Sequence, residues 1–290
     1  HMTQLLVILF FFSMPYDLNA AGHCPYQLVQ FRLADGSAGM GFAASPENEP
    51  LSKVVEITDL LPEPRPSFYT AAMTSFLSDL QCQLSNNTSL RRARLRDVHA
   101  QDVLPAIPQP KNIVAMGMNE RAHAREVDRV GGEGFLFSKR MPITGPYGAI
   151  VRPAFSITDY EVELGVVIRK EISPGTVVTA DNLREYIAGF VLTNDVSNRT
   201  PILLTLGRTN FTPAKTYPSF LPVGPYFAPI ENFSPANRNA LLPALKMETF
   251  VLRKEDSESA SLPRAERRQF GTTDEREFFV GLAGAIQLAL

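Results

Sequence analysis

The chain has 290 residues, of which 44% are hydrophobic and 20% charged, and its 28 basic and 30 acidic side chains leave a net charge of −2. This composition is typical of a globular protein, and the near balance of charge removes the electrostatic case for nucleic-acid binding. The 23 prolines exceed the usual share of ~5% and favour turns and short strands over long helices.

An apolar run near the start of the chain, residues 5–12, is too short to cross a bilayer as a helix. His1 and Met2 before it resemble an expression scar. The run suits the apolar part of a secretory signal, although no Lys or Arg precedes it. A hydrophobic extension docked on the body and a misplaced start codon are the alternatives, and the residues leave all three open. Residues 1–22 are therefore set apart from the folded domains.

The chain contains two cysteines, Cys24 and Cys82. Two are too few for a disulfide framework or for a cysteine-based zinc site. One disulfide between them is possible in an oxidising compartment. Two unpaired thiols that behave as small hydrophobic side chains are the favoured interpretation.

The first folded segment, residues 23–108, is predicted to be a small β-rich domain. Apolar alternation and turn residues predict three strands, and helical spacing of apolar residues predicts a helix, in the order 27–33, 38–44, 54–60 and 67–84. The proline-rich stretch 105–110 is stiff and is the expected domain boundary.

The second segment, residues 109–290, is predicted to be a larger, β-rich α+β domain. Strands are expected at 111–118, 135–139, 160–170 and 186–193, and a short polar helix at 120–130. The first of these strands is expected to be buried. Residues 252–290 form an atypical tail that ends in an apolar, helix-like stretch.

Acidic residues of the strand at 160–170 are the first candidate site residues. Residues two apart on a strand share a face, so Glu161 and Glu163 are expected to point the same way. Two converging carboxylates repel each other unless a cation compensates, and their oxygens suit Mg²⁺, Mn²⁺ or Ca²⁺. Asp195 directly follows the uncharged stretch 187–193 and is a natural third ligand. A hydrated acidic edge strand and a turn aspartate are the alternatives.

A second group of candidate residues lies in the polar helix. His123 and Glu126 are three residues apart, so their side chains can touch on a helix. A carboxylate that binds one ring nitrogen raises the basicity of the histidine and leaves the other nitrogen free to deprotonate water. A surface helix with incidental polar residues is the alternative.

Two lysines, Lys139 and Lys215, lie in apolar or proline-rich surroundings. A partly buried lysine needs an anionic partner. That partner is a substrate carboxylate or enolate, or a structural glutamate.

Five motifs occur in a fixed order between residues 112 and 250. The first three are Gly-x-Asn-x-x-x-His-x-x-Glu at 117–126, Phe-Leu-Phe-x-Lys at 135–139 and Asp-Tyr-Glu-x-Glu-Leu at 159–164. The fourth is Gly-x-x-x-x-Asn-Asp-Val-Ser at 189–197. The fifth is Lys-x-Tyr at 215–217, followed by Pro-x-Gly-Pro at 222–225. In this order they resemble the fumarylacetoacetate hydrolase superfamily. Residues 31–36 also resemble the small N-terminal domain of longer members.

This resemblance implies a folded β-roll core, normally dimeric, that holds a divalent cation, usually Mg²⁺. The ligands implied are Glu161, Glu163 and Asp195. His123 and Glu126 on a lid helix would activate water, and Lys215 would lie near the dioxo group of the substrate. The candidate substrate-binding residues are Asn119, Lys139, Arg199 and Thr272.

The chain departs from the family pattern after Ser197 and in the tail, among other places. After Ser197 the family has Ala-Arg-Asp and a polar helix, whereas this chain has Asn-Arg-Thr at 198–200 and an apolar stretch at 202–204. In the tail, the Gly-Thr-Pro-x-Gly-Val loop that lines the family's active site is absent, and Gly271-Thr272 is its candidate replacement. We expect metal binding to tolerate this loss better than substrate specificity does.

The expected function is metal-dependent hydrolysis of a C–C bond in a 1,3-diketo acid, with His123 and Glu126 activating the water. An oxaloacetate decarboxylase or tautomerase, an isomerase of unsaturated dicarboxylates, and a catalytically impaired acid-binding relative are the alternatives. The expected partners are a small keto acid and a second copy of the chain, with no nucleic acid and no membrane span. The compartment is cytoplasmic by resemblance, or extracytoplasmic if residues 5–12 form a signal.

Overall fold

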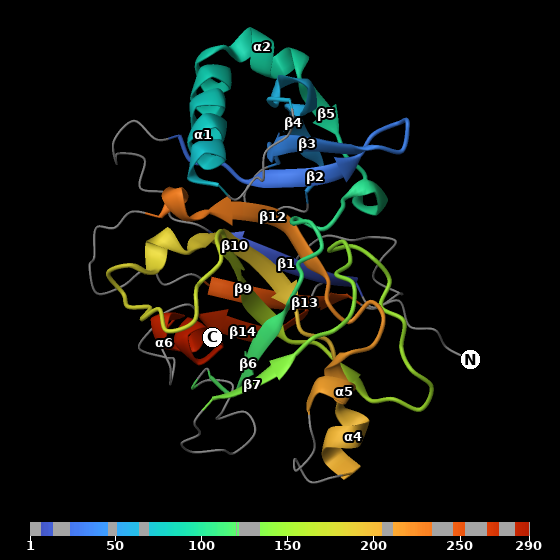
Figure 1. Ribbon diagram of the computed structural model, residues 1–290. Helices are drawn as coiled ribbons and strands as arrows, with labels where there is room; N and C mark the ends of the chain where they lie inside the picture. Colours follow the sequence, from blue (N-terminus) through green and yellow to red (C-terminus); the bar gives the residue numbers. More distant parts are fainter. Residues whose placement is uncertain are drawn as a thin grey trace.

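The computed structural model describes residues 7–13, 24–45, 51–63, 70–119, 121, 134–204, 211–233, 246–252, 266–272 and 282–289. Over these residues the protein is a mixed α+β structure with a seven-stranded sheet and three smaller sheets. Two helices cover the N-terminal strands at one end of the molecule, and two short helices lie at the other end (Figure 1). The predicted β-rich α+β class is confirmed.

The N-terminal half begins with an antiparallel hairpin. β2 (Leu28–Arg32) pairs with β3 (Ala38–Ala43), then come β4 (Lys53–Glu56) and β5 (Leu95–Asp97). Gly36 turns the hairpin at φ +85°, which glycine adopts without strain because it has no Cβ. The predicted hairpin is confirmed, whereas the third predicted strand ends early, because Thr58–Leu60 forms a 3₁₀ turn, η1.

Helix α1 (Ala71–Asn86) packs on these strands. It begins after Thr70, whose hydroxyl accepts a hydrogen bond from the Met73 backbone N–H at 3.3 Å. Asn87 ends α1 and caps α2 (Thr88–Ala93) by accepting from Leu90 N–H at 3.0 Å. The buried face of α1 shares one core with strand residues; the side chains are Met73, Leu77, Leu80 and Leu84 of α1 and Leu28, Phe42 and Val55 of the strands. The predicted helix is confirmed, with both ends a few residues later.

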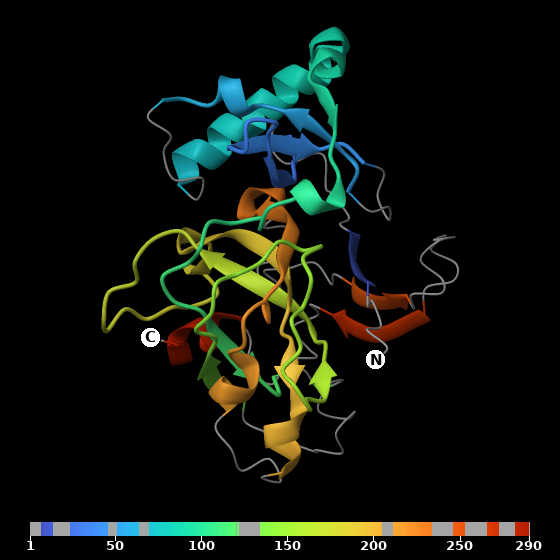
Figure 2. The same cartoon turned by 90° about the vertical axis from the view of Figure 1, so that its right-hand side faces the viewer.

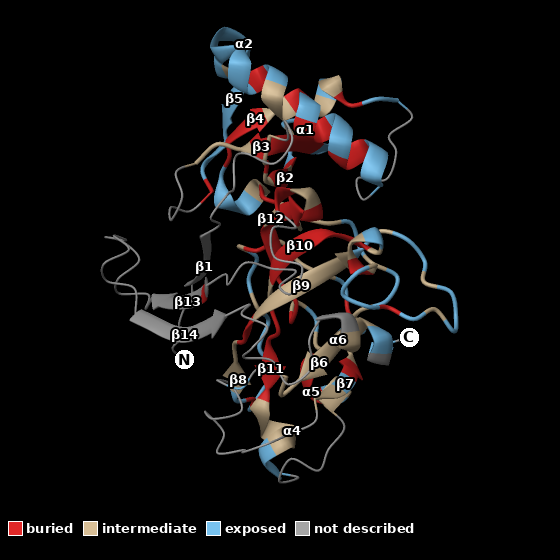
Figure 3. Ribbon diagram, turned by 90° about the vertical axis from the view of Figure 1, so that its left-hand side faces the viewer, coloured by how far each residue is buried: buried red, intermediate tan, exposed pale blue. Residues whose placement is uncertain are grey.

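One sheet runs through both halves of the chain. Its order is β5-β4-β3-β2-β12-β10-β9, where β12 is Val223–Pro229, β10 is Ile187–Asn194 and β9 is Val162–Ile168. β2 meets β12 at the pair Leu28–Phe227. β10 lies inside the sheet and is buried along nearly all its length, whereas β9 at the edge is half-buried (Figure 3). This sheet contains strands from before and after residue 108. The boundary between domains 23–108 and 109–290 therefore stays a prediction.

Three smaller sheets and several short helices complete the described part of the chain. The sheets are β1 (Val7–Ser13) with β13 (Lys246–Leu252) and β14 (Glu266–Thr272), β6 (Val114–Gly117) with β7 (Phe135–Ser138), and β8 (Thr158–Asp159) with β11 (Ser197–Asn198). The helices are η2 (Ala100–Asp102), η3 (Leu183–Glu185), α4 (Arg199–Leu204), α5 (Phe211–Lys215), η4 (Ile230–Asn232) and α6 (Leu282–Ala289). Within the described ranges, no helix combines the length and apolarity needed to span a bilayer.

The apolar run near the start of the chain forms β1. It pairs antiparallel with β13 from Val7–Leu252 to Ser13–Lys246. The sheet that it joins lies at the side of the molecule (Figure 2). In this structure the run is thus docked on the body as a strand, while its use as a signal and the placing of the start codon stay open.

The strands expected in the second half are largely confirmed. The segments 135–139 and 160–170 contain β7 and β9, and β10 matches 186–193 to within one residue at each end. The buried strand expected at 111–118 is wrong in its burial: β6 is shorter, and Val114 is exposed because β6 pairs with β7 alone. The helix expected at 120–130 lies outside the described residues except for Arg121. The apolar end of the tail forms α6.

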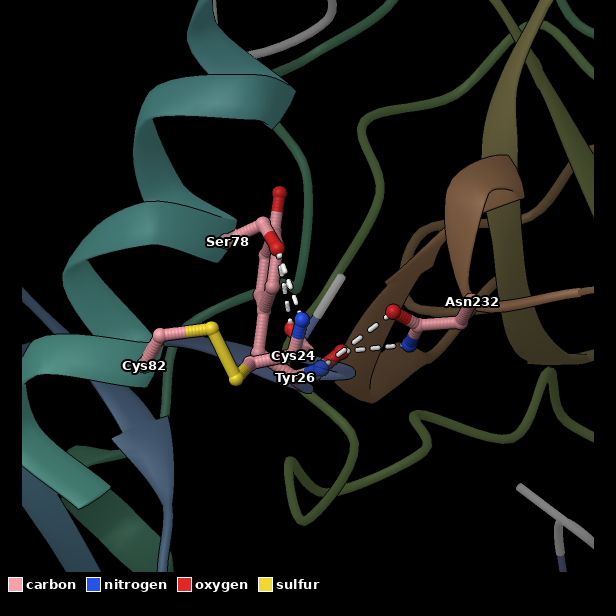
Figure 4. The surroundings of a disulfide bond; sticks show 5 residues. All are labelled: Cys24, Tyr26, Ser78, Cys82 and Asn232. Carbon is pink, nitrogen blue, oxygen red and sulfur yellow. Dashed lines mark hydrogen bonds between the residues drawn. A yellow bond between two sulfur atoms is a disulfide. The ribbon is translucent and has the colours of Figure 1, made fainter. Parts of the chain in front are cut away.

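The two cysteines form a disulfide, so the interpretation of unpaired thiols is wrong. Cys24 precedes β2 and Cys82 lies on α1, with their Cα atoms 5.3 Å apart. The Ser78 hydroxyl lies between the backbone N and O of Cys24, at 3.0 and 3.2 Å (Figure 4). Asn232 of η4 accepts from Tyr26 N–H at 3.2 Å and donates to Tyr26 O at 2.7 Å. The chain before β2 is thus fastened to α1 on one side and to η4 on the other.

The buried Tyr26 makes stability depend on alkaline pH. Burial raises the pKa of the Tyr26 phenol far above its ordinary value of 10.0, and the nearby Glu231 raises it further. An unfolded chain loses this proton near pH 10 while the folded chain keeps it, so the free energy of unfolding falls as pH rises above that value. We expect Tyr26→Phe to reduce this fall, measured by urea unfolding between pH 7 and 11. Equal slopes for the variant and the wild type would contradict the assignment.

Candidate active site

The backbone of β9 and β10 brings two acidic residues together. Thr193 pairs with Glu163, and Asn194 pairs with Val162. One step further, Asp195 N–H donates to Glu161 O at 2.9 Å. Residues 187–193 are uncharged and rich in β-propensity, so they form a buried strand that ends where the polar Asn194 and Asp195 begin. The ends of the two strands therefore place Glu161 beside Asp195.

The side chains of Glu161 and Asp195 converge on one ammonium group. Their residues are only 4% and 6% exposed. Lys215, at the end of α5, donates to Glu161 Oε2 at 2.7 Å and also to Asp195 Oδ2. Two carboxylates buried this closely would repel each other strongly without a cation between them. Lys215 supplies that cation in this structure.

Two more cations complete the cluster. Lys139 donates to the second oxygen of Asp195, Oδ1, and to Val196 O at 3.3 Å. Arg199 donates to Glu161 Oε1, and its Nε binds Asp159 Oδ2 at 2.8 Å. Three carboxylates, of Asp159, Glu161 and Asp195, are thus paired with three cations, of Lys139, Arg199 and Lys215. The cluster is electrically balanced.

Burial and ion pairing act in opposite directions on the basic groups. Burial lowers the pKa of Lys139 below its ordinary value, although Asp195 opposes this shift. Burial would also lower the pKa of Lys215, but Asp195 and Glu161 together raise it above the ordinary value. Arg199 behaves in the same way: burial lowers its pKa, and the stronger combined effect of Glu161 and Asp159 raises it. The two-carboxylate contact of Lys215 explains its difference from Lys139.

The structure brings together half of the predicted site residues. Glu161, Asp195, Lys215, Lys139 and Arg199 share one cluster. Among the described residues, no three His, Cys, Asp or Glu side chains are arranged to hold a metal ion. The assignment of Glu163 as the third ligand therefore stays a prediction.

For four further predicted site residues, no described contact tests the expected role. His123 and Glu126 fall outside the described residues. Asn119 follows β6 and is half-buried. Thr272 ends β14, where its backbone pairs with Lys246, and its side chain lies outside the described part. Their expected roles stay predictions.

Sequence reasoning missed two members of the cluster, Asp159 and Phe137. Asp159 stands two residues before Glu161, the same spacing that singled out Glu163, and this repetition could have indicated it. Phe137 lies below Lys215, with Nζ 4.8 Å from the ring centroid, which is the distance of a cation–π contact. The only signal for Phe137 is its spacing of two residues from Lys139.

The buried carboxylates fit a divalent cation. Glu161 Oε2 and Asp195 Oδ2 bind the same nitrogen atom, so they already converge on a single cation position. Carboxylate oxygens are the donors that Mg²⁺, Mn²⁺ and Ca²⁺ prefer. Glu163 and Asp159, each two residues from Glu161 along the chain, are the further carboxylates nearest to it in sequence.

Comparisons with known proteins found a matching family model and curated relatives. A family model described as "Fumarylacetoacetate (FAA) hydrolase C-terminal" matches residues 112–274, more than half of the chain. The mitochondrial oxaloacetate tautomerase FAHD2A of Homo sapiens is 34% identical over 158 residues, which are 53% of this chain and 49% of that protein. A fumarylacetoacetate hydrolase domain-containing protein 2 homolog of Dictyostelium discoideum is 34% identical over 143 residues, 48% and 44% of the two chains. The chain thus spans about half the length of the curated relatives it matches.

Solved structures show the same fold. A fumarylacetoacetate hydrolase from Exiguobacterium antarcticum gives a TM-score of 0.60 at 22% identity, covering 91% of this chain and 80% of that one. A maleylpyruvate hydrolase from Sphingobium sp. SYK-6, in complex with manganese(II) and pyruvate, gives 0.50 at 20% identity, covering 90% and 82%. The family match, the relatives and the common fold agree with the motif order in the sequence. The chain belongs to the fumarylacetoacetate hydrolase superfamily.

Proposed function

We propose that this protein is a divalent-metal-dependent enzyme that acts on a keto acid through its enolate. The observation that carries the proposal is the convergence of two buried carboxylates, Glu161 and Asp195, on one cation, which in this structure is the Lys215 ammonium. An enolate is an anion, and it is stabilised by positive groups held in place before the reaction. Buried carboxylates stabilise such positive groups in a site where the loss of hydration would otherwise be unfavourable.

The residues of this chain have distinct parts in the proposed reaction. Glu161 and Asp195, with Glu163 as the proposed third ligand, would hold Mg²⁺, or alternatively Mn²⁺ or Ca²⁺. Such an ion supplies Lewis-acid polarisation of the keto and carboxylate oxygens of the substrate. Lys215 would donate to the oxygen that becomes negative in the enolate. Arg199 holds Glu161 from the side opposite Lys215, through Oε1.

The first candidate reaction is hydrolysis of a C–C bond in a 1,3-diketo acid such as an acylpyruvate. His123, held by Glu126, would take a proton from water as the water oxygen attacks the distal carbonyl carbon. The bond between that carbon and the central carbon then breaks. Its electron pair passes into the enolate of the departing keto acid, which is protonated on carbon. The products are a carboxylic acid and pyruvate.

The second candidate reaction is keto–enol tautomerisation or decarboxylation of a β-keto acid such as oxaloacetate. The names of the curated relatives favour it, since those proteins, at 34–37% identity, are called oxaloacetate tautomerases. Tautomerisation moves a proton between carbon and oxygen and needs no attack by water. It therefore requires Lys215 and the acidic residues but not water activation by His123.

A panel of substrates together with His123→Ala separates the two candidates. The purified protein is assayed with acylpyruvates, oxaloacetate and unsaturated dicarboxylates, with Mg²⁺ or Mn²⁺ and after treatment with EDTA. If the protein is a hydrolase, we expect His123→Ala to lower acylpyruvate cleavage by about 10²–10⁴-fold. If it is a tautomerase or decarboxylase, we expect turnover of oxaloacetate that survives this substitution. In both cases EDTA should abolish turnover.

A protein that binds the metal but turns over no member of the panel would be the impaired relative that the altered tail suggests. Turnover that EDTA leaves intact would overturn the metal-dependent proposal. The homodimer implied by the resemblance is part of the same proposal, and analytical ultracentrifugation tests it. Cytoplasmic and exported forms are distinguished by fractionation of cells that express the chain, with the mitochondrial location in the relatives' names as a third possibility.

A further inference from the structure

Strand β7 presents one buried face to the acidic cluster. Side chains alternate along β7 and into Lys139, the residue that follows it, so Leu136 is 39% exposed whereas Phe137 is 7% and Lys139 3% exposed. β7 lies beside α5 in two views (Figures 1 and 3). Phe135 of the strand contacts Phe211 of the helix, with ring centroids 4.6 Å apart. The strand is thus packed against the helix that carries Lys215.

Lys139 and Lys215 divide the two oxygens of Asp195 between them. Lys139 binds Oδ1 and Lys215 binds Oδ2. Lys139 is fixed from a second direction by Val196 O at 3.3 Å, and its backbone N–H donates to Ile113 O at 3.2 Å. Its side chain is 2% exposed. An ammonium group held in this way directs its N–H donors at acceptors of the protein. This arrangement fits a structural role better than contact with a substrate that binds and leaves.

We infer that Lys139 is a positioning residue that orients Asp195 for metal binding, and that it does not bind the substrate. This inference rests on the proposed function, in which Asp195 is a metal ligand. With Oδ1 held by Lys139, Oδ2 is the oxygen turned toward Glu161 at the shared cation position. Partners that orient a ligating carboxylate in this way typically change metal affinity by 10- to 100-fold when removed.

Phe137 supports the same arrangement from the same face of β7. The Lys215 Nζ lies over its ring, 4.8 Å from the centroid, so a cation–π contact adds to the two carboxylate contacts of this ammonium. One strand therefore positions both lysines of the cluster. The contact between Phe135 of β7 and Phe211 of α5 holds the strand against the helix.

The test is the affinity for Mn²⁺ without substrate, measured by calorimetry or by the spin resonance of the free ion. We expect Lys139→Met, which keeps the length of the side chain and removes its charge, to weaken Mn²⁺ binding by about 10- to 100-fold. At saturating Mn²⁺, KM for the substrate should stay at the wild-type value. Lys53→Met is the matched control, because Lys53 is 46% exposed and pairs with the exposed Asp97. It should leave Mn²⁺ affinity unchanged.

The opposite pattern would overturn the inference: unchanged Mn²⁺ affinity together with a raised KM would make Lys139 a substrate-binding residue. If Lys139→Met does not fold, as judged by thermal unfolding, the same two measurements are made on Lys139→Arg. Arginine keeps the charge but not the position of the ammonium, so weaker Mn²⁺ binding with normal KM again supports the inference. Failure of the wild-type protein to bind Mn²⁺ would instead overturn the proposed function.

Discussion

Asp195→Asn is expected to destabilise the protein by about 3–5 kcal/mol and to abolish metal binding. The substitution keeps the shape of the side chain but leaves Lys139 and Lys215, both buried, without the charge that compensates them. Removing one partner of a buried ion pair typically costs this much because the remaining charge has no water and no counterion. Urea unfolding in the presence of EDTA measures the first effect without a contribution from bound metal.

The control for this experiment is Asp97→Asn. Asp97 pairs with Lys53 at the surface, where both side chains are largely exposed and water screens their interaction. We expect its unfolding midpoint to match that of the wild type. An Asp195→Asn protein as stable as the wild type would show that the carboxylate is not held between two buried ammonium groups.

Cys82→Ser is expected to lower the free energy of unfolding by about 4 kcal/mol. The disulfide joins residues 58 positions apart, and closing a loop of this length restricts the unfolded chain by ~4 kcal/mol in the chain-entropy model. Its folded-state neighbours, Ser78 and Asn232, hold the same segment by hydrogen bonds, so the fold itself should persist. Urea unfolding of oxidised wild type and of the variant gives the difference directly.

Reduction of the wild type is an internal check on this value. Wild-type protein in dithiothreitol should unfold at the same urea concentration as Cys82→Ser, and the variant should not respond to the reductant. A wild-type midpoint that dithiothreitol does not shift would show that the two sulfurs are unpaired in solution.

The features that the sequence predicted well depend on short-range periodicity. Alternation and turn residues located β2, β3, β9 and β10, because these patterns reflect the backbone geometry of each element. The position of Asp195 at the end of an uncharged run placed it correctly at the end of β10, next to Glu161. The motif order then gave the family, which the family match confirms.

The features that the sequence missed are contacts between distant segments. Lys139 is 56 residues from Asp195, and no local pattern indicates that the two side chains pair. The disulfide likewise depends on how α1 packs over β2, which spacing alone does not reveal.

The hydrogen bonds of the Asn232 side chain affect which expression host is suitable for this protein. Asn232 is followed by Phe233 and Ser234, and Asn198 by Arg199 and Thr200, so both match the acceptor pattern for N-linked sugars. Both are buried: the Asn232 amide nitrogen donates to Tyr26 O at 2.7 Å, and that of Asn198 to the Tyr217 hydroxyl at 3.4 Å. A glycan on either nitrogen would have no room in the folded protein. A host that does not glycosylate is therefore the suitable source of material.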